Sequence, residues 1–319
     1  MLWLRIPKKV YFKRGCMPVA LRELHEVYRL NRAFIVSDPD LYREGVVGPV
    51  DRMLNKQGIR TAEYLAEGGL STFRNAGNGL QKMEELQPEV IIGVGGAEIM
   101  SLAKIMWLLY ENPDIDLEQT ADRFGEISAS EAGFPLTGQK ARLVLIPTAA
   151  GYGLECSPFA VAGDDAGKKR IIADYSLIPE MAVLDADYAQ AETPEMAKDA
   201  GRKALTLAVR SLTCEGATDY ARGFAMDAAR MVLENLPVVV EKGPKAPVAR
   251  ETLANAAALA GMAAGNSLKT IDPAEPLYPT EEDMKPSGAE AEVIGELAKQ
   301  AGFGSAEDWL AACRKLEAL

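Results

Sequence analysis

The sequence predicts an α/β protein in which a Rossmann-like domain with a parallel sheet is followed by an all-helical domain. In the first part of the chain, short and almost wholly apolar runs alternate with longer amphipathic stretches. After Asp185 the chain becomes rich in Ala, Leu and Met and contains no strand-like run. A chain of 319 residues can form two domains. We therefore predict a nucleotide-binding-type domain over residues 1–186 and a helical domain over 187–319.

Four apolar runs, each bounded by Gly, Pro or Asp on at least one side, are the expected strands of a buried parallel sheet. They are Ala33–Ser37, Val90–Val94, Leu143–Pro147 and Met181–Leu184. The helical stretches that alternate with them are Val19–Leu30, Val47–Gln57, Ser71–Leu86 and Ala97–Tyr110. Strands that alternate with helices are typical of βαβ units, with helices on both faces of the sheet.

The helical part begins with a clear start signal, in which Thr193 caps the helix and Pro194 takes its first position. The expected helices are Met196–Leu212, Tyr220–Leu236, Val248–Leu268, Glu290–Ala301 and Ala306–Leu316. The segment Asp272–Ser287 contains four prolines and five acidic residues, which predicts an irregular connection.

Charge and histidine content exclude several classes of function. The chain has 46 acidic and 35 basic residues and a formal net charge of −11, which argues against binding to nucleic acid or to an anionic membrane surface. Its single histidine, His25, excludes a metal centre built from two or three histidines of one chain.

Cysteine usage and the absence of apolar spans predict the compartment. The four cysteines are far apart and show no metal-binding or redox spacing, which is typical of reduced thiols in a cytosolic protein. The first residues have no secretory signal pattern, and no apolar run approaches the length of a membrane span. We therefore expect a cytoplasmic protein.

Two glycine loops follow buried strands. Gly95 and Gly96 connect the strand Val90–Val94 directly to a helix, an arrangement in which backbone N–H groups and the helix N-terminus can bind phosphate. The other interpretation is that glycine only lets the helix pack closely on the sheet. The second loop, residues 148–153, follows Leu143–Pro147. Both loops would face one crevice at the carboxyl edge of the sheet, where ligands bind in open α/β folds.

With these loops the chain resembles the iron-containing alcohol dehydrogenases, most closely the alcohol dehydrogenase half of the bifunctional aldehyde-alcohol dehydrogenases. The matching stretches are 5–15, 35–38, 90–107, 148–162, 173–185 and 247–250. The resemblance implies a fold of the dehydroquinate-synthase type and NAD(P)-dependent interconversion of alcohols and aldehydes. It also implies a divalent metal, usually iron, held by one Asp and three His of the helical domain, that polarises the substrate oxygen.

Several positions match the cofactor site of the family. By resemblance, Asp38 contacts the adenosine ribose and favours NAD, and Gly95 and Gly96 belong to the pyrophosphate loop. Thr148 and Gly151 belong to the second loop, and Lys169 lies near the cofactor. NAD(P) is therefore the candidate cofactor.

The same loops also depart from the family pattern. Where the family has a serine after its glycines, this chain has Glu98. A carboxylate about 4 Å from a phosphate costs on the order of 4 kcal/mol at an effective dielectric of about 20, or roughly a thousandfold in affinity. The alternative is that Glu98 turns to solvent in the first turn of its helix, where acids are favourable. Tyr152 would also place a ring where the nicotinamide would lie.

The metal side of the resemblance departs completely. The ligand pair Asp-x-x-x-His falls on Lys203 and Leu207, and the region that should hold the two downstream histidines lacks them. His25 belongs to the first helix of the other domain and is expected to be a surface or core-edge residue. We therefore expect no metal-ligating residues, and no bound iron or zinc.

Two hypotheses of function follow from these departures. In the first, the chain is a degenerate family member, a pseudoenzyme that acts as a binding or assembly protein. Its expected partners are a second copy, in a homodimer, or a related dehydrogenase, because family members associate through their N-terminal strand and helical domain. In the second, Lys203 replaces the metal in a metal-independent NAD(P) oxidoreductase and polarises a carbonyl. The competing interpretation of Lys203 is a solvated helix residue.

Overall fold

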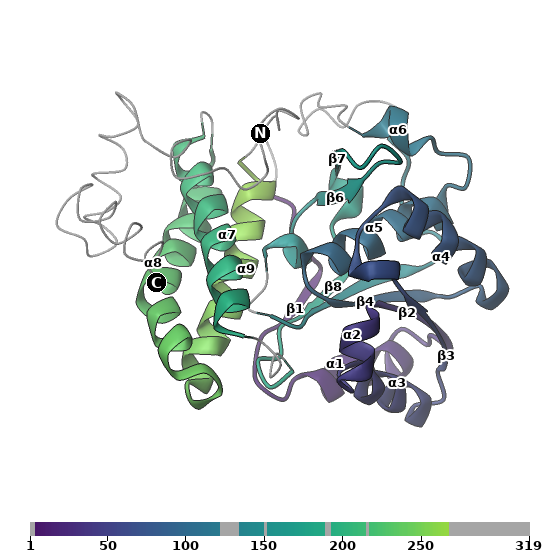
Figure 1. Cartoon of the computed structure of the whole chain (residues 1–319), viewed down its shortest axis with the longest axis horizontal. Coiled ribbons are helices and arrows are strands. Elements are labelled where there is room, and N and C mark those ends of the chain that lie inside the picture. The colour runs from purple at the N-terminus through teal and green to yellow at the C-terminus, as the bar shows by residue number, and fades with distance from the viewer. Residues whose placement is uncertain (1–3, 122–133, 150–151, 189–192, 215–216, 268–319) are drawn as a thin grey trace.

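The computed structural model, shown in Figure 1, describes residues 4–121, 134–149, 152–188, 193–214 and 217–267. Its centre is a six-stranded sheet in which all neighbouring strands are parallel. The strands, in spatial order, are β1 (Lys9–Tyr11), β8 (Met181–Val183), β5 (Arg142–Pro147), β4 (Val90–Gly95), β2 (Arg32–Ser37) and β3 (Arg60–Leu65).

The four strands expected from apolar runs are confirmed as β2, β4, β5 and β8, which form the interior of the sheet. The two edge strands were not expected. β1 has only three residues, and β3 is mostly half-buried because it has a neighbour on one side only. Neither edge strand contains the continuous apolar run by which a fully buried strand is recognised.

Helices cover both faces of the sheet. They are α1 (Met17–Glu26), α2 (Pro39–Arg43), α3 (Val47–Lys56), α4 (Phe73–Leu86) and α5 (Ala97–Glu111), and the short helix α6 (Leu117–Thr120) follows α5 in the chain. Alternate residues of β2 enter different hydrophobic clusters: Phe34 packs with α4 and α5, whereas Ile35 packs with α1 and α3. The first helix ends earlier than expected, and Arg29, just beyond its end, adopts a left-handed backbone conformation with φ 60°.

An antiparallel hairpin, absent from the sequence prediction, lies beside α5. It consists of β6 (Phe159–Gly163) and β7 (Lys169–Ala173) and forms a separate two-stranded sheet. The hairpin matters for the site because it brings Lys169 of β7 to the N-terminal end of α5.

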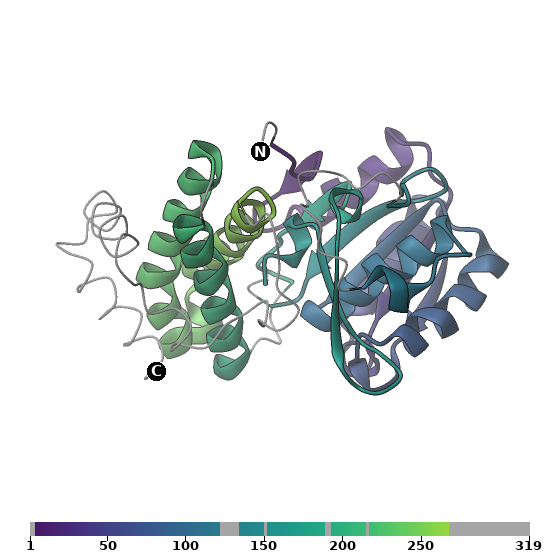
Figure 2. The ribbon, with the colours of Figure 1, turned by 90° about the horizontal axis from the view of Figure 1, so that it is seen from above.

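The chain then forms three helices, α7 (Pro194–Thr213), α8 (Asp219–Lys242) and α9 (Pro247–Gly265). The expected cap is confirmed, since Thr193 Oγ1 accepts a hydrogen bond from Met196 N–H at 3.2 Å. Figure 2 shows the three helices packed together beside the α/β part, with α9 next to it. The two further helices and the irregular connection expected beyond residue 268 lie outside the described residues.

One hydrophobic cluster is shared by the sheet, α4, α5 and the three C-terminal helices. The boundary at residue 186 therefore stays a prediction, although β8 ends at Val183 and α7 begins at Pro194. Among the residues that the structure describes, no helix combines the length and the apolar character needed to cross a membrane. Cys16, Cys156 and Cys214 are free thiols, in line with expectation.

Candidate functional site

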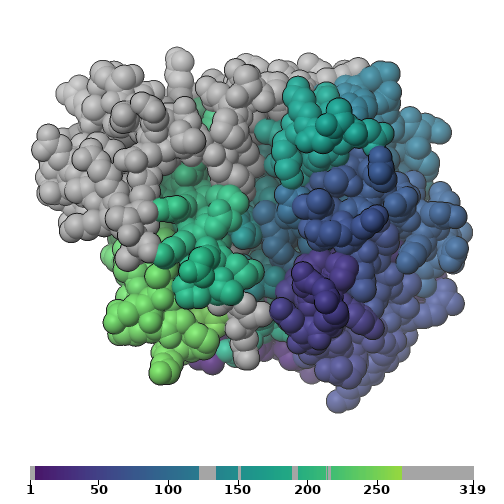
Figure 3. Space-filling view, in the orientation of Figure 1, coloured from purple at the N-terminus to yellow at the C-terminus, as the bar shows by residue number. Residues whose placement is uncertain are grey.

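The candidate site lies at the carboxyl edge of the sheet. Asp38, Gly96 and Thr148 directly follow β2, β4 and β5, which are neighbours in the sheet. Thr148 N–H donates to the carbonyl of Gly95 at 3.2 Å, so the two loops are joined at their base. The chain changes direction across the sheet between β2 and β4, which makes this edge a topological switch point. In Figure 3 the surface recedes between the green helices and the purple-to-blue part.

Asp38 has a structural role at this edge. Its Oδ1 accepts the N–H groups of Asp40 at 2.9 Å and Leu41 at 2.8 Å, and so caps α2. The pattern Asp-Pro-Asp could have revealed this cap from the sequence. A contact between Asp38 and a ribose stays a prediction.

The two glycines of the first loop, Gly95 and Gly96, have different structural roles. A Cβ on Gly95 would lie 2.6 Å from the Cβ of Ile99, so this glycine permits close packing of α5 on the sheet. Gly96 is the N-cap of α5, and a Cβ there would lie 3.6 Å from Cε2 of the Tyr152 ring. Gly151, predicted in the second loop, lies outside the described residues.

Glu98 holds two partners from distant segments. Its Oε1 lies 2.7 Å from Nζ of Lys169 in β7, and its Oε2 accepts the N–H of Ser71 at 2.7 Å. The side chain of Glu98 is 39% exposed. Glu98 thus lies in the first turn of α5 with a partly exposed side chain, as the alternative expected, and its carboxylate is also paired with an ammonium and an amide. Lys169 contacts this carboxylate, and its place near a cofactor stays a prediction.

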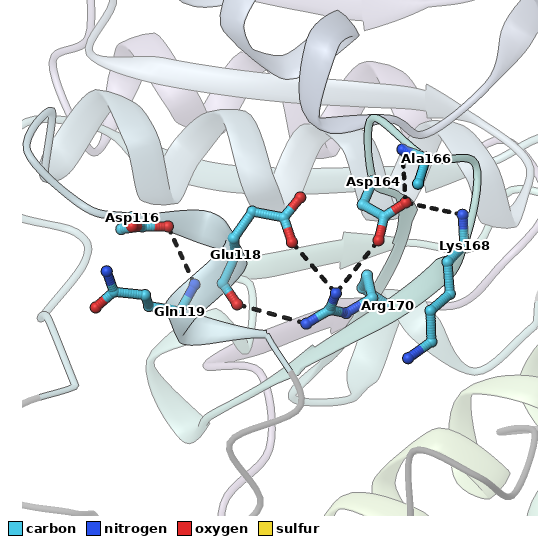
Figure 4. A network of polar contacts seen from close by, with 7 residues as sticks. All are labelled: Asp116, Glu118, Gln119, Asp164, Ala166, Lys168 and Arg170. Atoms are coloured by element: carbon cyan, nitrogen blue, oxygen red, sulfur yellow. Dashed lines mark hydrogen bonds and ion pairs between the residues drawn. The ribbon is translucent and has the colours of Figure 1, made fainter.

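The next residue of β7 is also paired with acids, as Figure 4 shows. Arg170 Nη1 lies 3.2 Å from Asp164 Oδ2 and 3.2 Å from Glu118 Oε2. Asp164 also accepts the N–H groups of Ala166 at 3.0 Å and Lys168 at 2.8 Å, which fixes the hairpin turn. Adjacent basic residues of β7 are thus bound by carboxylates from the first turns of α5 and α6.

Lys203 and Leu207, one turn apart on α7, face the second glycine loop. Lys203 Nζ lies 4.9 Å from the centre of the Tyr152 ring and 2.7 Å from Asp199 Oδ2, and its side chain is 30% exposed. Leu207 is fully buried, and its Cδ1 would lie 3.0 Å from a Cβ on Gly153. Lys203 is thus a partly exposed helix residue that pairs with an acid one turn away, and its role in polarising a carbonyl stays a prediction.

These residues do not fit a divalent metal. A leucine side chain has no donor atom, and a protonated lysine offers no lone pair. Within the described ranges, no group of three or more His, Cys, Asp and Glu side chains is placed to hold an ion. His25 lies in α1, half-buried, with Nδ1 3.3 Å from the carbonyl oxygen of Leu30, which agrees with its expected place at the edge of the core.

Two buried ionisable residues beside the second loop, Lys104 and Glu155, were not identified from the sequence. Lys104 of α5 is fully buried and donates from Nζ to the carbonyl oxygens of Ser157 at 2.5 Å and Phe159 at 2.9 Å. Burial lowers the pKa of Lys104 to about 7, although the charge of Glu155 opposes this shift. Burial likewise raises the pKa of Glu155 to about 7. A lysine in the otherwise apolar stretch 99–109 was the available signal.

The fold is that of an α/β protein with a parallel six-stranded sheet and a helical C-terminal region. Two family models match the chain, "Iron-containing alcohol dehydrogenase" over residues 7–186 and "Fe-containing alcohol dehydrogenase family, C-terminal" over residues 199–272. The chain belongs to the iron-containing alcohol dehydrogenase family, which confirms the resemblance.

Curated relatives agree with this assignment. The chain is 35% identical over 301 residues to the aldehyde-alcohol dehydrogenase of Clostridium acetobutylicum, covering 94% of this chain and 35% of the relative. It is 36% identical over 272 residues to the bifunctional aldehyde-alcohol dehydrogenase AdhE of Escherichia coli strain K12, covering 84% and 30%. The chain thus spans about a third of the length of these relatives.

Solved structures confirm the fold. An iron-containing alcohol dehydrogenase from Thermococcus thioreducens superposes with a TM-score of 0.84 at 21% identity, covering 100% of this chain and 85% of the other. A sulfoacetaldehyde reductase from Bifidobacterium kashiwanohense, solved in complex with NAD+, gives 0.81 at 19% identity and covers 100% and 86%. The predicted fold class, a parallel-sheet domain followed by helices, is correct.

Proposed function

We propose that this chain is a family member without metal-dependent alcohol or aldehyde turnover and that it acts as a binding or assembly protein. The observation that carries the proposal is the pair Lys203 and Leu207 on α7. The family resemblance assigns an Asp and a His ligand to these positions, which face the second glycine loop. A cation at Lys203 would also repel a divalent ion placed nearby.

Metal content and turnover, measured on one preparation, test this proposal. We expect purified protein supplied with iron and zinc to retain well under one ion per chain by elemental analysis. We also expect no NADH or NADPH consumption with short aldehydes above a buffer blank, since no group takes the role of the metal. Stoichiometric metal, or metal-dependent aldehyde reduction, would contradict the proposal.

The assembly role requires a partner, and we propose a second copy or a related dehydrogenase in the cytoplasm. Light scattering on the purified protein should give twice the chain mass of 34.4 kDa. Co-expression with a bifunctional aldehyde-alcohol dehydrogenase tests the mixed assembly, because a stable complex should elute together at a fixed ratio. A monomer that forms neither complex would contradict the assembly role.

A second candidate function uses Lys203 in place of the metal. Its Nζ lies 4.9 Å from the centre of the Tyr152 ring, and Cε2 of that ring would lie 3.6 Å from a Cβ on Gly96 at the start of α5, which supports a role in polarising a carbonyl there. Hydride would pass from NAD(P)H to the carbonyl carbon, and the oxygen would take a proton to give the alcohol. Lys203→Ala should then abolish a metal-independent aldehyde reduction that Lys242→Ala leaves intact. Equal activities in both variants would exclude this function.

A further inference from the structure

Three features that attract an anion converge on the carboxylate of Glu98. Its two oxygens lie 2.7 Å from the Lys169 ammonium and 2.7 Å from the Ser71 amide nitrogen. The residue also lies in the first turn of α5, a helix of 15 residues whose N-terminus carries partial positive charge. The three features come from the loop before α4, the start of α5 and the start of β7.

Without the Glu98 carboxylate, the position between these three features would suit a phosphate. It adjoins a glycine turn at the carboxyl edge of a parallel sheet, next to the switch point between β2 and β4. A free helix N-terminus, a free amide and an unpaired lysine are the usual groups that bind a phosphate there. In this chain a side chain of the protein already uses them.

We propose that Glu98 is a built-in carboxylate that occupies this anion site and excludes the phosphates of a dinucleotide. Glu98 is thus the residue that determines whether the crevice accepts a nucleotide. The inference rests on the proposed function in one respect: a protein that does not turn over alcohols or aldehydes does not need to bind NAD(P). It concerns binding, whereas the proposed function concerns metal and catalysis.

Tyr152 fills the same edge on the other side of the glycine turn. Tyr152 is 8% exposed, and its Cε2 would lie 3.6 Å from a Cβ on Gly96. The Lys203 ammonium lies 4.9 Å from the centre of its ring. A probe that tests Glu98 alone must therefore lack a nicotinamide. ADP meets this condition, because it presents an adenosine and two phosphates and needs no space at Tyr152.

The experiment is calorimetric titration of ADP into wild type, Glu98→Ser and Glu118→Ser. Glu118 is the matched control, since it too is an acid in the first turn of a helix and pairs with the adjacent β7 residue Arg170. We expect Glu98→Ser to bind ADP about 10- to 100-fold more tightly than wild type. The gain is below the thousandfold of an unscreened contact because the carboxylate is partly exposed.

A further variant makes the result specific. Lys169→Ala in the Glu98→Ser background should remove most of the gain, and circular dichroism checks that each variant is folded. Micromolar ADP binding by wild type would overturn the inference, as would equal affinities of Glu98→Ser and Glu118→Ser or a gain that survives Lys169→Ala. None of these results depends on metal content or turnover, so failure here and failure of the proposed function are distinguishable.

Discussion

The buried pair Lys104 and Glu155 shows how single residues hold the second glycine loop. The Lys104 ammonium bonds two carbonyls of the chain that enters β6 and stands within the field of Glu155. Both residues are fully buried, and burial is the main cause of both pKa shifts, which the charge of the other residue opposes. Removing Lys104 also removes the donor that its two carbonyl partners share.

Lys104→Met should destabilise the protein by about 1–3 kcal/mol at pH 8, because the carbonyls of Ser157 and Phe159 lose their buried donor, and by clearly less at pH 5. The folded-state pKa of Lys104 is lowered to about 7 from 10.5, so below pH 7 the wild type must bury a charged ammonium that the variant lacks. The penalty of the variant relative to wild type therefore shrinks on acidification. Urea unfolding at both pH values measures the change, with exposed Lys56→Met as control. A penalty independent of pH would contradict this account.

At the scale of elements, the sequence predicted the interior of the fold better than its edges. β2, β4, β5 and β8 are buried on both sides and therefore read as apolar runs. β3 and β7 escaped prediction because most of their residues are exposed or half-buried, and β6, although mostly buried, is a short run that ends in glycine. Their positions depend on contacts with α4 and α5, which local sequence does not encode.

The contact between the second loop and α9 depends on two glycines. Gly153 adopts φ +80°, and a Cβ on Gly261 would lie 1.9 Å from the Gly153 carbonyl oxygen. Since the obstacle is backbone, no side-chain rotation can relieve it. The loop and the helix therefore approach as closely as their backbones allow, and this closeness places Leu207 and Tyr152 at the crevice.

Gly261→Ala should destabilise the protein by about 1–3 kcal/mol, because overpacking outweighs the roughly 1 kcal/mol that alanine gains in a helix. Gly223→Ala in α8 is the matched control, since a Cβ there meets nothing within 4 Å. It should be neutral or stabilise by up to about 1 kcal/mol. Chemical denaturation of both variants measures the difference, and equal effects would show that the contact carries no constraint.

At the scale of the whole molecule, the sequence predicted where a site would lie but not how its side chains meet. Carboxyl ends of parallel strands share an edge, so Asp38, Gly96 and Thr148 could be brought together from topology alone. The contact of Glu98 with Lys169 joins residues 71 positions apart through a hairpin that was not expected. Pairings of this kind depend on tertiary packing and have no periodic signature.

The shared hydrophobic cluster implies that the α/β part and the helices unfold together. Ile91 of β4, Trp107 of α5 and Leu207 of α7 belong to the same cluster. A protein that keeps Trp107 and carries Trp3→Phe and Trp309→Phe should show coincident fluorescence and far-ultraviolet dichroism midpoints in urea. Gly261→Ala should lower both midpoints equally, because Trp107 would report a change made in α9. If Gly261→Ala moves the dichroism midpoint and leaves the Trp107 transition in place, the helices fold as a separate unit and the common core is refuted.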